Sequence, residues 1–471
     1  MKNMLDFKYE SLDLEPEQVK ALKKLSKIVG KKIPVLDERG LPAFGFKIKN
    51  NDVTGLWLYR CGLTKFPDII FEFKELKELF LSYNLLSSIP NSIENLHLLK
   101  NLNLKWNFLI TLPKSIGNLD SLQKLKLDSN KISHLPDSFG NLHSLEILKL
   151  RDNNLKTLPD SFKDFKTLKK LYLNKNLFED LPDGITNLES LNLLNLENNK
   201  IKKLSMAMES LTSLHLLSLA NNNLKNLMAD IIEPINTLKS LRTLDFSHNL
   251  LKELPESIGN LKNLEILRLR GNELQSLPDS FKNLDSLISL DLSNNKFKIF
   301  PEEITKLTNL KRLFFEGNEL KSLPESLSEL KSLRKLFLEG NQLKMLPQSF
   351  GKLTSLQRAY LVNNQLNSLP ESLGDLNSLK TLDLRNNNLK ELPLSIYDLT
   401  SLQELDLRYN RFTTIPSSIW KLKGIKKYFL KLEGNPLDVK SKNVIAGGLK
   451  EIQKYSRERD QLKDLLKNID N

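Results

Sequence analysis

The sequence predicts an α/β fold of the solenoid type: a curved horseshoe with a parallel sheet on its concave face and short helical or 3-10 connections on its convex face. Three observations lead to this prediction. A leucine pattern returns every 23 residues, apolar residues alternate within each repeat, and the 18 Gly and 19 Pro of the 471 residues never gather into a linker. Hydrophobic residues make up 40% and charged residues 27% of the chain, which is the composition of a folded protein. One continuous array is therefore expected, although a chain of this length would otherwise suggest about three globular domains.

The repeat is clearest at Leu76-x-x-Leu79-x-Leu81-x-x-Asn84, which returns 23 residues later. A step of 27 residues between Leu214 and Leu241 places four extra residues within Met228–Ser240, where we expect a larger convex connection. With a degenerate first copy at Val53 and a shifted last copy ending near Leu437, about 17 repeats fill residues 53–438. The regular repeats open at Leu76, Leu99, Leu122, Leu145, Leu168, Leu191, Leu214, Leu241, Leu264, Leu287, Leu310, Leu333, Leu356, Leu379 and Leu402.

Each part of the repeat has a structural reason. The alternation Leu102-x-Leu104 predicts a short strand with one face inward. Asn107 follows where the chain leaves the strand, and its amide can bond backbone groups that a buried turn leaves open. The Leu-Pro step at Pro113 and the apolar Ile116 predict a short helical return on the convex side. No repeat can bury its leucines alone, so the repeats must stack.

Both ends of such a stack need a cover. Residues 1–52 predict a helix-plus-hairpin cap, with an amphipathic helix over Pro16–Lys31 and a strand at 44–48 that turns back through 50–52. The helix is expected to bury one stripe of Val19, Leu22, Leu25 and Ile28. Residues 439–471 predict a C-terminal helical cap, and a partner-binding helix is the alternative for this tail.

Catalytic, metal and cofactor sites are not expected. The sequence contains no P-loop pattern and no His-Glu-x-x-His, and its five His fall in different repeats. The single cysteine, Cys61, occupies the turn position of the first repeat and excludes a disulfide framework. The N-terminus has no apolar run of signal-peptide length and no 18-residue apolar stretch follows, so we expect a cytoplasmic monomer without a membrane span.

The repeat phrases identify a family resemblance. Leu-Pro-Glu-Ser-Ile-Gly-Asn-Leu at 254–261, Leu-Pro-Asp-Ser-Phe at 277–281 and Leu-Glu-Gly-Asn-Pro-Leu at 432–437 are typical of the leucine-rich repeat. From Val53 to Leu437 the chain resembles the intracellular Ras-group leucine-rich repeat proteins. The resemblance implies a non-enzymatic protein-protein interaction scaffold, in intracellular signalling. The shared residues are structural, so no functional residue can be transferred from the family.

The predicted partner site lies on the concave face. The third, fifth, seventh and eighth residues of each repeat point to the open side of the sheet, where packing does not fix their identity. Aromatic and arginine side chains there are typical of binding interfaces, although stacked rings can also simply shield one another along a sheet. We predict that three successive repeats bind a protein through an aromatic column, a cationic flank and an acidic flank: Phe314, Phe337 and Tyr360; Arg312, Lys335 and Arg358; Glu316 and Glu339.

A second patch gives an alternative function. The first third of the repeats places aromatic and basic residues at the same positions, and the chain has a formal net charge of +13. Nucleic acid or another polyanion could bind there through Lys contacts and stacking, although no RNA-binding motif is present and nucleic acid is the less favoured partner. A Lys-rich face that only keeps the protein soluble is the simpler interpretation. The patch comprises Trp57, Tyr59, Phe80, Lys105, Trp106, Lys124, Lys126, Lys149, Arg151 and Lys170, with Tyr83 and Lys175 beside them.

Overall fold

The computed structural model describes residues 9–36, 44–203, 208, 210–225, 235, 237–416, 419–422, 424–425 and 430–469. The chain divides into two compact modules: the first module comprises residues 1–224 and 233–241, and the second comprises 225–232 and 242–471. The division falls at the four added residues, and most of the predicted enlarged connection, 228–234 and 236, lies outside the described residues. One continuous solenoid over 53–438, like the outer limits of the two caps, stays a prediction.

The first module contains helix α1 (Pro16–Ile28), a hairpin and a run of parallel strands. Strand β1 (Phe44–Lys49) pairs antiparallel with β2 (Asp52–Leu58) through Asn50 and Asn51, which adopt left-handed backbone angles. From β2 onward each described strand pairs in parallel with the next, Leu on Leu, as in Leu79↔Leu102. These strands are β3 (Glu78–Phe80), β4 (Asn101–Asn103), β5 (Lys124–Lys126), β6 (Ile147–Lys149), β7 (Lys170–Tyr172), β8 (Leu193–Asn195) and β9 (Leu216–Ser218).

The second module repeats the same parallel arrangement and ends in two α-helices, α3 (Val439–Ala446) and α4 (Leu449–Ile469). Its strands are β10 (Thr243–Asp245), β11 (Ile266–Arg268), β12 (Ser289–Asp291), β13 (Arg312–Phe314), β14 (Lys335–Phe337), β15 (Arg358–Tyr360), β16 (Thr381–Asp383), β17 (Glu404–Asp406) and β18 (Leu430–Lys431).

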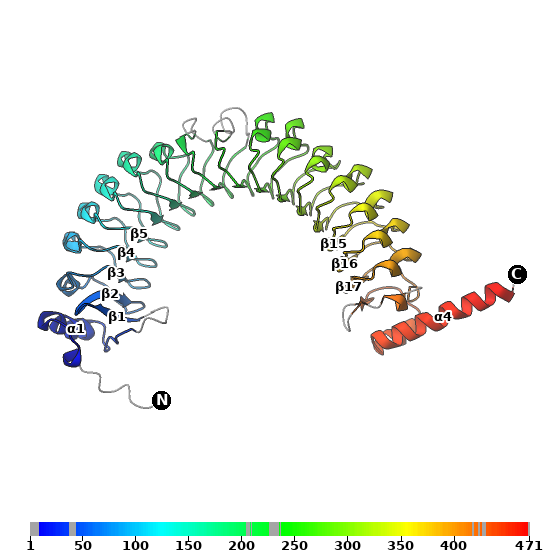
Figure 1. The fold of residues 1–471 in the computed structure, drawn as a ribbon, viewed down its shortest axis with the longest axis horizontal. Coiled ribbons are helices and arrows are strands. Elements are labelled where there is room, and N and C mark those ends of the chain that lie inside the picture. The colour runs from blue at the N-terminus through cyan, green and yellow to red at the C-terminus, as the bar shows by residue number, and fades with distance from the viewer. Residues whose placement is uncertain are drawn as a thin grey trace. The chain divides into compact units, whose positions relative to one another are not determined.

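Short 3-10 helices return the chain along the convex side of each module, opposite the strands (Figure 1). This arrangement confirms the predicted fold class. The described 3-10 helices are Tyr9–Ser11, Asp68–Glu72, Asn91–Asn95, Lys114–Asn118, Asp137–Asn141, Asp160–Asp164, Asp183–Asn187, Glu256–Asn260, Asp279–Asn283, Glu302–Lys306, Glu325–Glu329, Gln348–Lys352, Glu371–Asp375, Leu394–Asp398 and Ile419–Lys421.

Glycine lets neighbouring 3-10 helices approach closely. Gly351 follows the buried Phe350, and a Cβ built on it would lie 1.9 Å from the carbonyl oxygen of Ser372 in the next repeat. Gly117 and Gly259 meet a serine carbonyl in the same way. The Ser-Ile/Phe-Gly phrase of the sequence is therefore a packing requirement of the convex side.

Asparagines join successive repeats by closing the turn of the repeat before them. The Asn107 Nδ2 donates to Leu104 O of its own repeat and to Leu81 O of the preceding one, both at 3.0 Å. Its Oδ1 accepts from Leu86 N of the preceding repeat, also at 3.0 Å. We call the row of such residues the asparagine ladder. It confirms the predicted role of the turn Asn.

The first repeat has Cys61 at the ladder position. Its turn is closed by Asn84, whose Oδ1 accepts from Cys61 N at 3.0 Å and Leu63 N at 3.1 Å. An Asn at position 61 would find no preceding repeat whose turn its side-chain amide could close. The fold therefore does not require an Asn there, and Cys is accepted. Burial raises the pKa of the Cys61 thiol, which keeps it protonated and agrees with a structural role.

The N-terminal helix buries a slightly different stripe from the predicted one. Leu22 and Leu25 are fully buried as expected, but Ile28 is 53% exposed and Val29 takes the inward position. Val19 is half-buried. The next turn continues the stripe from Leu25 at a spacing of four, not three, and a helix permits either spacing. Gln18 ties the helix to the hairpin, because its Oε1 accepts from the backbone N–H of Val53 at 2.8 Å.

The C-terminal helix covers the last repeats with its first half. Ile452 is 4% exposed, the Ser456 hydroxyl donates to Pro416 O at 3.2 Å, and Trp420 Nε1 donates to Asp460 Oδ2 at 3.0 Å. Leu462 and Leu465, in the second half of the helix, are each 60% exposed. The cap contacts therefore end near residue 460, within the part of α4 whose side chains are described.

Candidate functional site

The predicted aromatic column forms a continuous stack. Phe314, Phe337 and Tyr360 end strands β13, β14 and β15 and pair with one another in register. Ring centroids of Phe314 and Phe337 lie 4.5 Å apart at 9°, and those of Phe337 and Tyr360 lie 4.9 Å apart at 7°. All three side chains are half-buried, so their ring edges face the open side of the sheet. We call these residues the aromatic column.

Cations border one side of the aromatic column. Arg312, Lys335 and Arg358 begin the same three strands and pair in register. Arg358 is exposed, whereas Arg312 and Lys335 are half-buried. The Arg312 Nε is buried and has no hydrogen-bond partner among the residues that the structure describes. A buried donor without a partner costs about 1–3 kcal/mol, which a bound acceptor would recover.

Carboxylates border the other side. Burial raises the pKa of Glu339 to about 7, helped by the nearby carboxylates of Glu316 and Asp383 and opposed by Arg385. Burial likewise raises the pKa of Glu316, although a hydrogen bond from the Ser293 hydroxyl opposes the shift. The Glu339 Oε2 is buried without a hydrogen-bond partner in the described part of the chain. Each edge of the column thus holds one buried polar atom without a hydrogen-bond partner among the described residues.

The two strand-face aspartates beyond this acidic flank are not solvated. Asp383 is 7% and Asp406 2% exposed, because the guanidinium groups of Arg385 and Arg408 cover them. Arg385 Nη2 lies 2.8 Å from Asp383 Oδ2, and Arg408 Nη2 lies 2.6 Å from Asp406 Oδ2. These two carboxylates are neutralised within the protein, so they add little free negative charge to the acidic flank.

One residue of the predicted basic aromatic patch, Trp57, is buried and does not lie on the open face of the sheet. Trp57 is only 5% exposed, because its ring stacks on Phe80 at 5.2 Å and Lys47 of β1 lies over it at 5.0 Å. The ring also folds against Gly55, whose missing Cβ makes room for it. The N-terminal hairpin therefore covers Trp57 and removes it from the open face of the sheet, and Phe80 is half-buried beside it.

The other aromatics of the patch form a chain of contacts. Tyr59 meets Tyr83 edge to face at 5.0 Å, and Tyr83 stacks on Trp106 at 5.3 Å. Arg60 lies over both tyrosine rings, 5.3 Å from Tyr59 and 5.1 Å from Tyr83. Tyr83 and Trp106 are 39% and 49% exposed.

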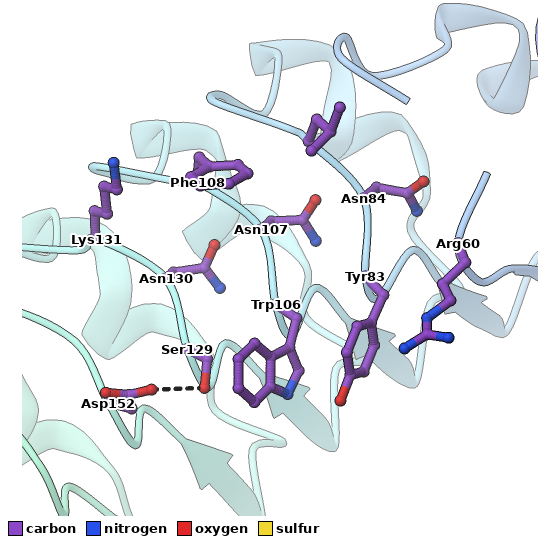
Figure 2. Close-up of a pocket in the computed structure, with 11 residues that line it drawn as sticks. Arg60, Tyr83, Asn84, Trp106, Asn107, Phe108, Ser129, Asn130, Lys131 and Asp152 are labelled. Carbon is purple, nitrogen blue, oxygen red and sulfur yellow. Dashed lines mark hydrogen bonds between the residues drawn. The ribbon is translucent and has the colours of Figure 1, made fainter. Parts of the chain in front are cut away.

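The rings of Tyr83 and Trp106 line one wall of a hollow of about 510 Å³ that was not predicted from the sequence. In Figure 2, Asn84, Asn107 and Asn130 of the ladder lie in a row, with Tyr83 and Trp106 on one side and Phe108 and Lys131 on the other. The sequence signal was an apolar residue directly after the ladder Asn in two successive repeats, Leu85 and Phe108. The predicted sites included only the third, fifth, seventh and eighth residues of each repeat, and the residue after the ladder Asn is not among them. We call this hollow the lateral groove.

The basic residues of the patch lie close together on strands β5 to β7. Lys124 and Lys170 are exposed, and Arg151 is exposed just after β6. Burial lowers the pKa of Lys126 and Lys149, and the charge of Lys105 lowers both further. Lys105 is partly compensated, since its Nζ lies 2.6 Å from Asp128 Oδ2. This strand face therefore carries an excess of positive charge.

Neither a metal site nor a membrane-spanning helix is found among the described residues. Among the described residues, no group of three or more His, Cys, Asp or Glu side chains could hold a metal ion. Within the same residues, no helix is long and apolar enough to cross a membrane.

Comparison with known families agrees with this architecture. A model of leucine-rich repeat regions matches residues 125–250 and 199–314. Further leucine-rich repeat models match 297–343, 75–96, 378–399 and 401–422. The structure is similar to that of a leucine-rich repeat protein from Leptospira interrogans, with a TM-score of 0.75 and 38% identity, over 79% of this chain and 94% of that one. The chain is a leucine-rich repeat protein.

More distant leucine-rich repeat structures come from plant receptors. The ectodomain of the Arabidopsis thaliana receptor kinase GASSHO1/SCHENGEN3, in complex with Casparian strip integrity factor 2, is 28% identical with a TM-score of 0.55, over 83% of this chain and 57% of that one. The Arabidopsis receptor kinase HAESA, in complex with the peptide hormone IDA and a co-receptor, is 27% identical with a TM-score of 0.54, over 79% and 72%. None of the curated proteins compared with the chain matches it. The leucine-rich repeat fold is commonly a protein-protein interaction module, not an enzyme.

Proposed function

We propose that this protein is a non-enzymatic scaffold that binds a protein partner on the concave face of its second module. The observation behind the proposal is the aromatic column of Phe314, Phe337 and Tyr360, stacked in register and left half-exposed. Aromatic and arginine side chains dominate the binding energy of protein interfaces, and exposed apolar rows usually mark them. The peptide complexes of the plant receptors above support the same kind of use for this fold.

The flanks determine the chemistry of the partner. Among the described residues, the Arg312 Nε on one edge lacks a hydrogen-bond acceptor, and the Glu339 Oε2 on the other edge lacks a donor. A partner segment with a carboxylate on one side of an apolar side chain and a cation on the other would complement the charges of Arg312 and Glu339. Opposite charges on two edges fix the orientation of a bound segment, so the column gives register as well as affinity.

The cellular setting is a further part of the proposal. The phrases at 254–261 and 277–281 resemble the intracellular Ras-group leucine-rich repeat proteins. We place the protein in the cytoplasm as a monomer in a signalling assembly. Polyanion binding through the basic patch is the less favoured function, because Trp57 is withdrawn from that surface and Lys105 is already paired.

Affinity purification with the full chain, followed by titration of the recovered partner, tests the proposal. Phe337→Ala should weaken binding by about 2 kcal/mol, close to thirtyfold. Loss of two ring stacks should also lower stability by about 1–2 kcal/mol. The stacked geometry of the rings is the reason for this stability cost; the outward position of Phe337 on its strand would by itself predict almost none. Binding should change little between low and moderate salt.

Tyr172→Ala is the matched control. Tyr172 occupies the same repeat position in the first module, where Lys149 lies over its ring at 4.6 Å and no aromatic stack of the Phe337 kind is formed among the described residues. This variant should keep full affinity for the partner. If Phe337→Ala loses stability while its affinity equals that of wild type, the column is only a packing device and the proposal is wrong.

A further inference from the structure

The lateral groove of the first module has two walls and a floor built from consecutive repeats. Residues just before the ladder asparagines form the first wall, with Tyr83 and Trp106 at its centre. Residues just after them form the second wall, with Leu85 49% and Phe108 45% exposed. The floor is the asparagine ladder itself, seen in Figure 2. The groove is therefore apolar on both sides over two repeats.

The two aromatic residues of the first wall adopt an unfavourable backbone conformation. Tyr83 and Trp106 have φ angles of 59° and 54°, in the left-handed region that bulky side chains rarely adopt. Most repeats of the second module place Asn or Gly at this position. Strained positions of this kind concentrate at functional sites. The large rings stand where a smaller residue would serve the fold better. The corresponding smaller residues are Gly271, Asn294, Gly317, Gly340, Asn363 and Asn386.

Cations stand at the two ends of the groove. Arg60 lies over Tyr83 at one end, and Lys131 lies 5.1 Å from the centre of the Phe108 ring at the other. Neither cation forms an ion pair among the residues that the structure describes. The positive potential of Lys126 and Lys149 lies on the adjacent strand face. A ligand with negative charge at both ends and an apolar centre matches this distribution.

We propose that the lateral groove binds an extended acidic segment of a partner protein, anchored by one aromatic or large aliphatic side chain. The anchor lies over Asn107 between Trp106 and Phe108, and carboxylates on either side of it meet Arg60 and Lys131. Three strand spacings, about 14 Å, separate the repeats that carry these two cations, and an extended chain covers that span in four to five residues. This site is separate from the aromatic column of the second module.

The lining favours a protein segment over a nucleic acid. Tyr83 and Trp106 use one ring face each on one another, and Leu85 on the opposite wall is aliphatic. The Asn107 Nδ2 and Oδ1 already bond the backbone, so the floor has few groups to read base edges.

The test is selection of peptides from a displayed library of random dodecapeptides on the full chain, followed by titration of the enriched peptides. Trp106→Asn is the central variant, because Asn occupies this position in other repeats and removes the ring without disturbing the turn. Enriched peptides should contain an aromatic or aliphatic anchor between acidic residues. Trp106→Asn should weaken them at least tenfold, and Lys131→Glu at least fivefold.

Two control variants show whether the peptides bind in the lateral groove or elsewhere on the protein. Tyr409→Asn makes the same change at the same repeat position of the second module, where Tyr409 has φ 56° and is 60% exposed, and it should leave affinity unchanged. Phe337→Ala should also leave it unchanged, so this site and the aromatic column can fail independently. Absence of acidic, anchored peptides, or equal binding by wild type and Trp106→Asn, overturns the proposal. Displacement of the peptides by a ten-nucleotide oligothymidine that binds more tightly overturns it in favour of nucleic acid.

Discussion

Replacement of a single ladder asparagine should cost far more stability than its size suggests. Asn272 is 6% exposed, and its Nδ2 donates to Phe246 O at 3.0 Å and to Leu269 O at 2.9 Å. Its Oδ1 accepts from Leu251 N at 3.1 Å. Asn272→Ala removes these bonds, together with a longer one to Arg270 O at 3.4 Å, and leaves the buried Leu251 N–H unpaired. One unpaired donor costs about 1–3 kcal/mol and each lost carbonyl bond adds a smaller amount, so we expect about 3 kcal/mol in total.

Urea unfolding followed by circular dichroism measures this loss, and amide exchange localises it. The Leu251 amide, which belongs to the repeat before Asn272, should exchange faster in the variant. Arg268→Ala is the control, because Arg268 is exposed and its nearest contact with Asp245 is 3.6 Å. A surface pair of this kind contributes within about 0.5 kcal/mol. If both variants lose the same free energy of unfolding, the assignment of inward and outward positions is wrong.

Two further predictions concern the acidic flank and the C-terminal helix. The pKa of Glu339 is raised to about 7 in the folded protein, so the folded state holds a proton that the unfolded state releases above about pH 4.5. Stability should fall as pH rises between these values. Glu339→Gln should melt like wild type at pH 4 and be more stable by about 1 kcal/mol at pH 8, allowing for solvent screening; an equal difference at both pH values would contradict this. Ile452→Ala should cost about 2–4 kcal/mol in urea unfolding, because Ile452 is 4% exposed. Leu462→Ala, at a position 60% exposed, should be almost neutral, and a reversed order would mean that the far half of α4 is the true cap.

Periodicity predicted most of the fold because each repeat obeys the same local rules. The 23-residue spacing of Phe314, Phe337 and Tyr360 was enough to place three rings side by side, since parallel strands in register keep equal positions adjacent. The ladder followed from the need to pair backbone groups in a buried turn. These features depend on the repeat alone.

Features that depend on other parts of the chain were not predictable in this way. Trp57 occupies an outward position of its repeat, yet the hairpin strand β1 and Lys47 cover it. The lateral groove depends on residues after the ladder, which the strand columns do not include. The buried stripe of α1 differs by one residue at its end, because 3.6 residues per turn allow either Ile28 or Val29 to face inward.

The asparagine ladder has a direction, and this direction bears on how the chain is made. Each Asn bonds its own repeat and the one before it, as Asn435 does when its Oδ1 accepts from Asn410 N at 3.1 Å and Phe412 N at 3.2 Å. During translation a repeat therefore emerges with its turn open and is completed only when the next Asn leaves the ribosome. Truncation from the C-terminal side always exposes a new open turn, whereas removal of repeats from the N-terminal side opens none. Beyond the last Asn, the α3 helix that begins at Val439 bonds a repeat through Ser441, whose hydroxyl oxygen accepts from Ile415 N at 3.3 Å.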